Sequence, residues 1–390
     1  MNLFSIEARR DPYPLYRQLR ERTPVLHVPG PNLWIVLRHA AVKRVLTDHE
    51  AFSSNVSALH GHDFAWLLFM DPPRHTKLRA IISKPFTSRA IAALEPRIRE
   101  LSRQLLDAAV ARGQLDLVAD YATPLPLMVI AELLGFPVAD WRELARWSET
   151  IVALGNTISG TGAAEAAAAF RAADAEMTDY FGRLVRERRA RPTSDLLARL
   201  VAAEVDGERL DDGELVRFCQ LLLAAGTETT TNLIDNAVIA LLEHSDQLAQ
   251  LRADASRIPA ALEEVLRHRT PVQAMFRATR REVTLDGVAL PERAFVIAAI
   301  GCANRDPDAF GDAERFDIAR EPNAHLAFGH GIHFCLGAPL SRLEGRIALT
   351  DLLARFASLE LVEPAWPPRS SFHVLGPASL PLRFTLARAR

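Results

Sequence analysis

Apolar residues recur at the spacing of an α-helix over most of the chain, whereas strand-like apolar stretches are few and short. A chain with this pattern is expected to be mainly α-helical with a small β region. The pattern predicts helices over residues 12–22, 39–47, 72–83, 89–112, 123–135, 139–155, 163–190, 212–243, 258–269 and 339–356.

Short apolar runs flanked by turn residues predict the strands. The runs VLHV (25–28) and LWIVL (33–37) are separated by Pro-Gly-Pro and predict a hairpin near the N-terminus. Further strands are expected at VTL (283–285), VAL (288–290), AFVIAAI (294–300) and SLPLRFTL (379–386). No repeat and no linker divides the chain, so residues 1–390 are expected to form a single domain.

Composition excludes several classes of protein. With 49% hydrophobic and 24% charged residues and a formal net charge of −2, the chain resembles an ordinary globular protein, which argues against nucleic acid as a partner. Three cysteines without regular spacing argue for a reducing compartment. Charges and prolines occupy the N-terminus, and no apolar run approaches the roughly 18 residues of a membrane span. We therefore expect a monomeric cytoplasmic protein with no membrane partner.

The stretch AHLAFGHGIHFCLGAPLSRLEGRIAL, residues 324–349, is the richest in chemistry. Cys335 stands just before a predicted helix that is marked by Gly337 and by Pro339 in its first turn. The sulfur would face free backbone N–H groups and the positive end of the helix dipole, which favours a thiolate.

The residues before Cys335 narrow the kind of partner. Gly329 and Gly331 permit the close approach of a large flat group, and Phe328 and Phe334 supply apolar shielding. This arrangement suits a thiolate bound to a metal inside a macrocycle.

Two other interpretations of the same stretch stay open from the residues alone. Cys335 could join His330 and His333 in a small zinc site, although structural zinc usually has four ligands in repeated Cys/His pairs. It could also be a structural cysteine in the core.

The pattern Phe328-Gly329-x-Gly331-x-x-x-Cys335-x-Gly337 is similar to the heme-binding signature of the cytochrome P450 family, with every position filled. The resemblance implies that Cys335 is the axial ligand of the iron of heme b. It also implies that Phe328 packs beside the sulfur. The implied architecture is the triangular, α-rich heme-thiolate fold with a small β region.

A second constellation lies in the helix predicted over 212–243, which would span roughly 48 Å. Gly226 is followed by four threonines in five positions, and the ionisable Glu228 stands in an otherwise apolar tract. Threonine side chains can bond back to the carbonyl one turn earlier and bend a helix. A kinked core helix with Glu228 paired to an arginine would explain the same residues.

The run Ala225-Gly226-x-Glu228-Thr229-Thr230 resembles the oxygen-activation motif of the family. In that motif the small residues form an oxygen pocket, and the acid and the alcohol deliver protons. The resemblance gives these two roles to Glu228 and Thr229, acting by general acid catalysis. Because both positions are intact, a dioxygen-using enzyme is favoured over a peroxide-driven one.

Glu264 and Arg267 form an i, i+3 pair, a spacing that means little alone because it also occurs elsewhere in the chain. Their place between the threonine-rich helix and the cysteine loop resembles that of the family's ExxR pair. The run AERFD (313–317) follows where the family has its third partner. The resemblance implies that Arg315 completes a salt-bridged triad that supports the heme loop.

The run MDPPRHTKLRAIISKPF (70–86) predicts a helix capped by Asp71, with His75 and Arg79 on one face as two cationic donors. A solvated basic helix would have the same spacing. In the resembling family this helix directs His and Arg at the heme propionates. Arg277 and His333 match two further propionate contacts.

The resemblance implies insertion of one atom of dioxygen into an organic substrate by hydroxylation or epoxidation, with electrons from NAD(P)H. A separate reductase and a ferredoxin or flavodoxin-type partner are implied, and arginines near the Cys335 loop, with Arg74, would suit an acidic carrier. A heme-thiolate protein that only binds a ligand, or one driven by peroxide, is the alternative.

The family's substrate pockets are lined by four segments, which here carry mostly apolar side chains. The predicted lining residues are Phe64, Leu67, Leu68, Leu221, Ala224, Val272, Ala274, Met275 and Val374. A hydrophobic small molecule such as a terpenoid, steroid, fatty acid or polyketide is therefore expected. The candidate polar anchors are His60, His62, Gln273 and His373.

Overall fold

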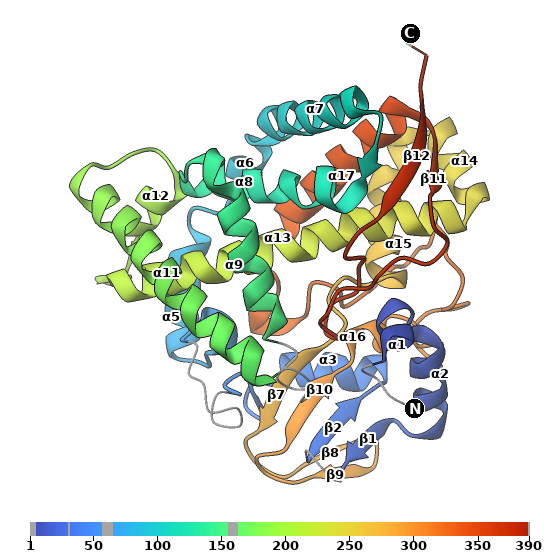
Figure 1. The fold of residues 1–390 in the computed structure, drawn as a ribbon. Helices are drawn as coiled ribbons and strands as arrows, with labels where there is room; N and C mark the ends of the chain where they lie inside the picture. The colour runs from blue at the N-terminus through green and yellow to red at the C-terminus, as the bar shows by residue number, and fades with distance from the viewer. Residues whose placement is uncertain (1–4, 30–31, 57–64, 155–162, 389–390) are drawn as a thin grey trace.

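The computed structural model describes residues 5–29, 32–56, 65–154 and 163–388, and helices dominate it (Figure 1). The first half contains α1 (Ile6–Arg10), α2 (Tyr13–Arg22), α3 (His39–Thr47), α5 (Arg74–Ser83), α6 (Ser88–Ala92), α7 (Glu95–Arg112), α8 (Pro124–Leu134), α9 (Trp141–Ala153) and α11 (Ala163–Ala190). The second half contains α12 (Leu196–Ala202), α13 (Asp212–Glu243), α14 (Ser245–Ala253), α15 (Ile258–His268), α16 (Ile300–Ala303) and α17 (Ala338–Arg355).

Every helical range that the sequence predicts contains a helix, and α13 has the predicted bounds. The range 89–112 is divided into α6 and α7, because Pro96 in the first turn of α7 lacks the N–H that a continuous helix needs there. The sequence pattern missed α1, α12, α14 and α16. The run AFVIAAI turns out to be a strand only as far as Ala298, and its last residue begins α16.

The larger sheet lies at one end of the molecule beside α1, α2 and α3 (Figure 1). Its strand order is β1-β2-β10-β7-β3, formed by β1 (Val25–Val28), β2 (Leu33–Val36), β10 (Phe295–Ala298), β7 (Met275–Thr279) and β3 (Phe52–Ser53). The predicted hairpin is confirmed: β1 and β2 are antiparallel, with Val25 opposite Val36. Strand β10 joins this hairpin in parallel with β2 and pairs β7 on its other side.

The other strands form smaller sheets. A three-stranded sheet has the order β11-β12-β4, from β11 (Phe356–Leu361), β12 (Pro381–Leu386) and β4 (Leu115–Asp116). Strand β12 confirms the strand predicted near the C-terminus, whereas β4 and β11 were not predicted. Two hairpins complete the set, β5 (Glu204–Val205) with β6 (Glu208–Arg209), and β8 (Val283–Leu285) with β9 (Val288–Leu290).

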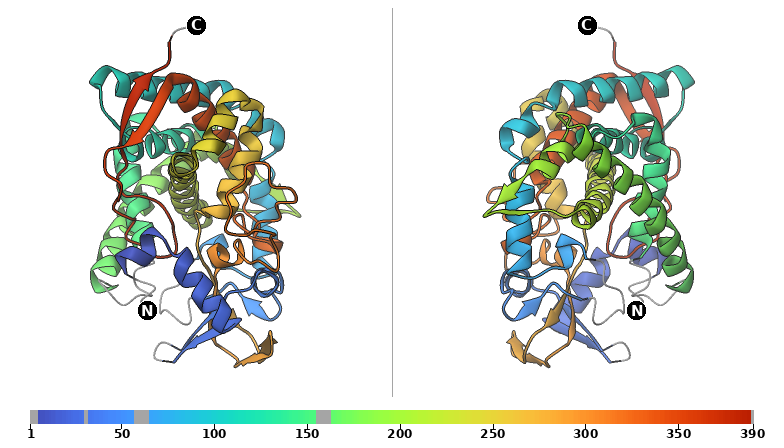
Figure 2. Two further views of the ribbon diagram at one scale, coloured as in Figure 1. Left: turned by 90° about the vertical axis from the view of Figure 1, so that its right-hand side faces the viewer. Right: turned by 90° about the vertical axis from the view of Figure 1, so that its left-hand side faces the viewer.

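Helix α13 runs through the middle of the helical part, and α8, α9, α11 and α17 pack against it. Figure 2 views α13 nearly along its axis, with other helices around it. Its start is fixed by a capping box, in which Asp211 accepts from the N–H of Glu214 at 2.8 Å and its own N–H donates to the Glu214 carboxylate at 3.0 Å. Helix α13 therefore carries its threonine-rich segment into the core.

Close packing brings α17 to α13. A Cβ atom on Gly345 of α17 would lie 3.2 Å from Leu233 of α13, so this contact depends on the missing side chain. The largest hydrophobic cluster contains residues from Tyr13 through Leu382. No helix in the described part of the chain is long and apolar enough to cross a membrane.

Candidate active site

Cys335 lies in the loop just before α17, and its N–H donates to the carbonyl of Phe328 at 2.9 Å. This bond closes a turn in which Gly329 and Gly331 have φ of +72° and +75°, where L side chains are strained. A Cβ atom on Gly331 would also lie 3.0 Å from the Leu46 carbonyl oxygen at the end of α3. The described structure therefore gives Gly331 a packing partner within the chain.

The surroundings of Cys335 act on the pKa of its thiol in two opposite directions. The residue is exposed overall, yet the protein packed round the sulfur raises the pKa of the thiol. The N–H groups of Gly337 and Ala338 and the guanidinium of Arg79 oppose this effect. The expected influence of the helix start is present but smaller than that of burial, so a bound cation would be needed to hold the thiolate.

The loop carries aromatic and cationic neighbours. The rings of Phe328 and Phe334 lie 6.4 Å apart between centroids, and Phe334 is 44% exposed. Arg342 of α17 stacks over Phe328 at 4.4 Å and donates to the Glu263 carboxylate at 2.7 and 2.8 Å. The Phe328 ring is therefore held between the loop and an ion-paired arginine.

Four predicted contacts of the propionates gather at this loop. The rings of His75 and His333 lie 4.1 Å apart, and Arg79 donates to the carbonyl of Phe334 at 2.7 Å. Burial and the Arg79 charge lower the pKa of His75 to about 4. Burial also lowers the pKa of Arg277, on β7, to about 10. The structure thus brings together arginine and histidine donors that lie far apart in the sequence.

Two members of this cluster, His75 and Arg277, are poorly matched within the described part of the chain, whereas His333 lies 2.9 Å from the Ser54 hydroxyl. His75 is 2% exposed, and neither of its ring nitrogens has a hydrogen-bond partner among the described residues. Arg277 is 3% exposed and donates to the carbonyl of its neighbour Phe276 at 2.7 Å. Such buried donors call for an anionic ligand. A cysteine sulfur beside buried donors for carboxylates fits heme, whose iron takes the thiolate and whose propionates take the cations.

The predicted cap of α5 is wrong. The helix begins at Arg74 after Pro73, and Asp71 instead accepts from the N–H of Ser54 at 2.9 Å and from Arg280 at 2.6 Å. The Asp71 carboxylate does not cap the helix because it binds the Arg280 guanidinium and the N–H of Ser54 instead. His75 and Arg79 keep their predicted positions on α5.

The threonine-rich segment of α13 lies next to the start of α17. Thr230 donates to the hydroxyl of Ser341, six residues after Cys335 in the chain, at 3.2 Å. Thr229 donates to the carbonyl of Ala225 at 2.7 Å, which confirms the predicted bond to the preceding turn. Ala225 is exposed in the middle of an otherwise buried helix.

Gly226 has a packing role that the sequence did not reveal. A Cβ atom there would lie 2.7 Å from the Cδ1 atom of Ile130 on α8. The glycine lets α8 and α13 approach, beside the predicted oxygen pocket. Helix α13 remains α-helical through this segment.

Glu228 is 5% exposed, and its carboxylate lies 3.2 Å from the Nε atom of Arg369. Burial raises the pKa of Glu228, and the Arg369 charge opposes this. The arginine considered as a partner for Glu228 is therefore Arg369, in the segment between β11 and β12. A buried carboxyl whose pKa is raised in this way is suited to hold a proton.

The ion pair of Glu264 and Arg267 is present, but its predicted third member is wrong. The Arg315 side chain is 64% exposed and lies 3.9 Å from Asp317, and only its carbonyl accepts from Arg267, at 2.9 Å. The arginine that pairs with Glu264 is Arg320, at 3.2 Å. Arg320 rather than Arg315 pairs with Glu264 because the Arg320 side chain, 11% exposed, points inward from the same loop.

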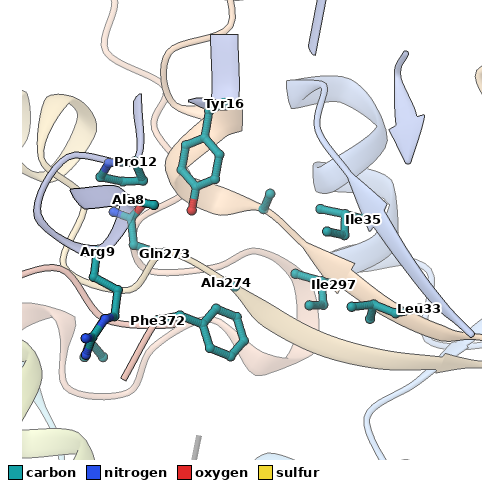
Figure 3. Close-up of a pocket in the computed structure, with 12 residues that line it drawn as sticks. Ala8, Arg9, Pro12, Tyr16, Leu33, Ile35, Gln273, Ala274, Ile297 and Phe372 are labelled. Carbon is teal, nitrogen blue, oxygen red and sulfur yellow. The ribbon is translucent and has the colours of Figure 1, made fainter. Parts of the chain in front are cut away.

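The predicted substrate residues are only partly described, since Phe64 and the candidate anchors His60 and His62 lie outside the described residues. Val272 and Val374 face one another in an isolated β-bridge. Ala274 and Val374 also line a cavity of about 30 Å³ together with Tyr16 and Ile35 (Figure 3). That volume holds about one water molecule, so the cavity is too small for an organic substrate.

Two of the proposed polar anchors are already engaged. The Gln273 amide, 1% exposed, donates to the carbonyl of Thr270 at 2.5 Å. The His373 ring lies 2.6 Å from the Ser371 hydroxyl, and burial lowers the pKa of His373 to about 4. Leu67 and Ala224 are buried, and Leu68, Leu221, Val272 and Met275 are partly buried.

Sequence reasoning missed Glu344, on α17. It is 1% exposed, its Oε1 atom has no partner among the described residues, and burial raises its pKa to about 8, an effect that a bond to Thr230 opposes. The signal was present, because a glutamate stands on the helix face that also carries Leu340 and Ile347.

An α-rich fold with a cysteine just before a helix, and buried donors for carboxylates beside it, is the arrangement expected of a heme protein with a cysteine ligand. Comparison with known proteins identifies the family. The family model described as cytochrome P450 matches residues 163–380. A relative named cyclomarin C epoxidase CymV, from Salinispora arenicola, is 39% identical and aligns over 98% of both chains.

Solved structures agree. Cytochrome P450 CYP109Q5 from Chondromyces apiculatus superposes with a TM-score of 0.90 at 39% identity, covering 100% of this chain and 99% of that one. CYP109E1 from Bacillus megaterium in complex with testosterone superposes with a TM-score of 0.86 at 37% identity, covering 96% and 99%. The chain belongs to the cytochrome P450 family, with the fold of its bacterial members, and is a monooxygenase of the oxidoreductase class. The family implies a heme cofactor and oxygen-dependent chemistry.

Proposed function

We propose that this protein hydroxylates or epoxidises a hydrophobic small molecule with heme b as its cofactor. The observation that carries the dioxygen-dependent reaction is the pair Glu228 and Thr229, an acid with a raised pKa next to an alcohol in the middle of α13. Heme, when bound, supplies the redox centre at which dioxygen is reduced and the substrate oxidised.

The residues of the chain then have separate tasks. Cys335 binds the iron as thiolate, and His75, Arg79, Arg277 and His333 bind the two propionates. Glu228 takes up and releases a proton, and the Thr229 hydroxyl, bonded to Ala225, passes it on toward the cofactor pocket. Ala225 leaves room beside that hydroxyl because it lacks a large side chain, whereas the space at Gly226 is taken by Ile130 of α8. Glu264, Arg267 and Arg320 position the loop that follows α16 and leads to Cys335.

The proposed substrate class rests on the apolar character of the predicted lining, which includes Leu67, Leu221 and Val374. Two relatives support it by their names, one as an epoxidase of cyclomarin C and one as a complex with testosterone. The main hydrophobic cluster extends from Tyr13 to Leu382, which supports a single working domain over the chain.

Electrons are proposed to come from NAD(P)H through a separate reductase and a ferredoxin or flavodoxin-type carrier. Arg79, beside the Cys335 loop, is a candidate contact for an acidic carrier. Arg74 is a weaker candidate than the sequence indicated, since it is paired with Glu214 and Glu208. All three cysteines are free of disulfides, which supports a cytoplasmic location.

The test is the absorption spectrum of the purified protein, reduced and exposed to carbon monoxide. We expect the strongly red-shifted Soret band of a thiolate complex, lost in Cys335→Ser and retained in the matched variant Cys219→Ala. Product formation should then require NAD(P)H, dioxygen and surrogate redox partners. No heme band after reconstitution would contradict the cofactor, and turnover with peroxide alone at the same rate would favour the peroxide-driven alternative.

A further inference from the structure

A stripe of polar side chains continues along α13 beyond Glu228. Asp235 and Asn236 lie about two turns further on, on the same side of the helix. Asn236 donates to the carbonyl of Leu375 at 2.8 Å and to that of Arg269 at 3.1 Å. The stripe therefore faces the segment 366–376, which also carries Arg369.

Asp235 is the unusual member of this stripe. It is 0% exposed, and neither carboxylate oxygen has a hydrogen-bond partner among the described residues. Burial holds the pKa of Asp235 well above its ordinary value, and the carboxylates of Asp116 on β4 and Glu228 act in the same direction. Arg369 is the one charge that opposes them there. An ionised carboxylate in this place would be poorly compensated.

Arg369 is held in position between these acids by its own backbone. Its N–H donates to the carbonyl of Gly376 at 2.9 Å, and its carbonyl accepts from Arg9 of α1 at 3.1 Å. A Cβ atom on Gly376 would lie 2.1 Å from the Asn232 side-chain oxygen, so the segment packs tightly on α13. The Nε atom of the guanidinium lies 3.2 Å from the Glu228 carboxylate as an ion pair, and neither Nε nor Nη2 makes a hydrogen bond among the described residues.

The Arg369 guanidinium lies 3.2 Å from the Glu228 carboxylate, and its charge opposes the rise in the pKa of both Glu228 and Asp235. One positive charge can neutralise only one of the two carboxylates, and the ion pair assigns the negative charge to Glu228. The remaining carboxyl, that of Asp235, is left to carry a proton.

We propose that Asp235 is a neutral acid that stores a proton behind Glu228, and that Arg369 is the positioning residue that passes its ion pair from one acid to the other. This proposal rests on the proposed function of Glu228. In the step, the O–H bond of Asp235 breaks and an O–H bond forms on Glu228, with water as the carrier. The charge moves from Glu228 to Asp235, Arg369 stays protonated, and Asp235 later takes a proton back from solvent.

The protonation state of Asp235 is tested first in the resting protein by infrared spectroscopy at neutral pH. We expect absorption of buried neutral carboxyl groups, part of which disappears in Asp235→Asn. Glu344→Gln serves to assign the contribution of the other buried acid. In Arg369→Gln the absorption should grow, because Glu228 loses its counter-charge and becomes neutral. An unchanged spectrum in Asp235→Asn would show that Asp235 is ionised and would overturn the proposal.

The catalytic part is tested in the heme-loaded protein with surrogate redox partners. Asp235→Asn should keep the carbon monoxide spectrum but slow product formation by about ten-fold, with a larger solvent isotope effect. This loss is smaller than the roughly 100- to 10,000-fold of a proton donor that acts directly on the reacting group, because Asp235 acts through Glu228. Arg369→Lys should recover part of the loss seen in Arg369→Gln. Unchanged turnover and isotope effect in Asp235→Asn would overturn the proposal. An absent heme spectrum in the unmodified protein would instead contradict the proposed function, while the infrared result would still decide the state of Asp235.

Discussion

The carboxylate of Glu264 accepts two hydrogen bonds from the guanidinium of Arg267, at 2.7 and 2.8 Å, and both side chains are fully buried. The same guanidinium donates to the carbonyls of Asn304 and Ala313, at 3.0 and 2.7 Å. The pair therefore ties α15 to the segment that leads from α16 toward Cys335. A buried ion pair with all its donors used is costly to break.

Arg267→Ala is expected to lower the free energy of unfolding by about 3–5 kcal/mol, because the buried Glu264 carboxylate loses both hydrogen bonds from Arg267 and keeps only Arg320 as a cation. Thermal or denaturant unfolding measures the change. Arg315→Ala is the matched control, since its exposed pair with Asp317 should contribute less than about 1 kcal/mol. Equal losses in the two variants would contradict the assignment of Arg320, rather than Arg315, as the third member.

Thr229→Ala is expected to divert electrons from product into hydrogen peroxide, because the hydroxyl bonded to Ala225 no longer passes the proton. The measurement compares NAD(P)H consumed, product formed and peroxide released. Thr229→Ser should keep most of the coupling since it retains the hydroxyl. Thr231→Ala provides a second comparison, because that hydroxyl donates to the carbonyl of Ala122 instead. Full coupling in Thr229→Ala would remove Thr229 from the relay.

Arg277→Leu is expected to weaken heme retention, because the guanidinium is a buried donor suited to a propionate. A hydrogen bond to a charged group contributes about 1.5–3 kcal/mol, which corresponds to a roughly 10- to 100-fold loss of affinity. Transfer of heme to an excess of an apoprotein acceptor measures this loss without any turnover. The exposed Arg281→Leu should retain heme like the unmodified protein. Equal retention in both variants would exclude Arg277 as a propionate contact.

Glu344→Gln is expected to raise stability at high pH relative to the unmodified protein. Burial raises the pKa of Glu344 from 4.5 to about 8, so the folded state holds a proton that the unfolded state has released. Stability then falls as the pH rises through that interval, by at most about 1.4 kcal/mol per pH unit. Glutamine cannot ionise, so the advantage of the variant should grow between pH 5 and pH 8.

Unfolding curves at several pH values provide the measurement for Glu344. The exposed Glu360→Gln is the control and should follow the unmodified protein at every pH. If Glu344→Gln ran parallel to the unmodified protein across this range, Glu344 would have an ordinary pKa.

The sequence by itself determined most of the longer helices, the N-terminal hairpin and the place of Cys335 just before a helix. These features follow from local causes: apolar periodicity places helices such as α13, and a short spaced pattern around Gly329 and Cys335 carries the resemblance to cytochrome P450. His75 and Arg79 lie on one face of α5 as predicted, because residues that are four apart in a helix are neighbours on its surface.

Tertiary structure alone decided the partners of the charged residues. Arg320 rather than Arg315 meets Glu264, Asp71 meets Arg280 instead of capping α5, and Arg369 reaches Glu228 from near the end of the chain. The sequence holds many arginines and acids at equivalent spacings, and an ion pair depends on burial and on distance in space. The same reason hid Asp235, because only the packing of segment 366–376 on α13 buries its carboxyl without a partner.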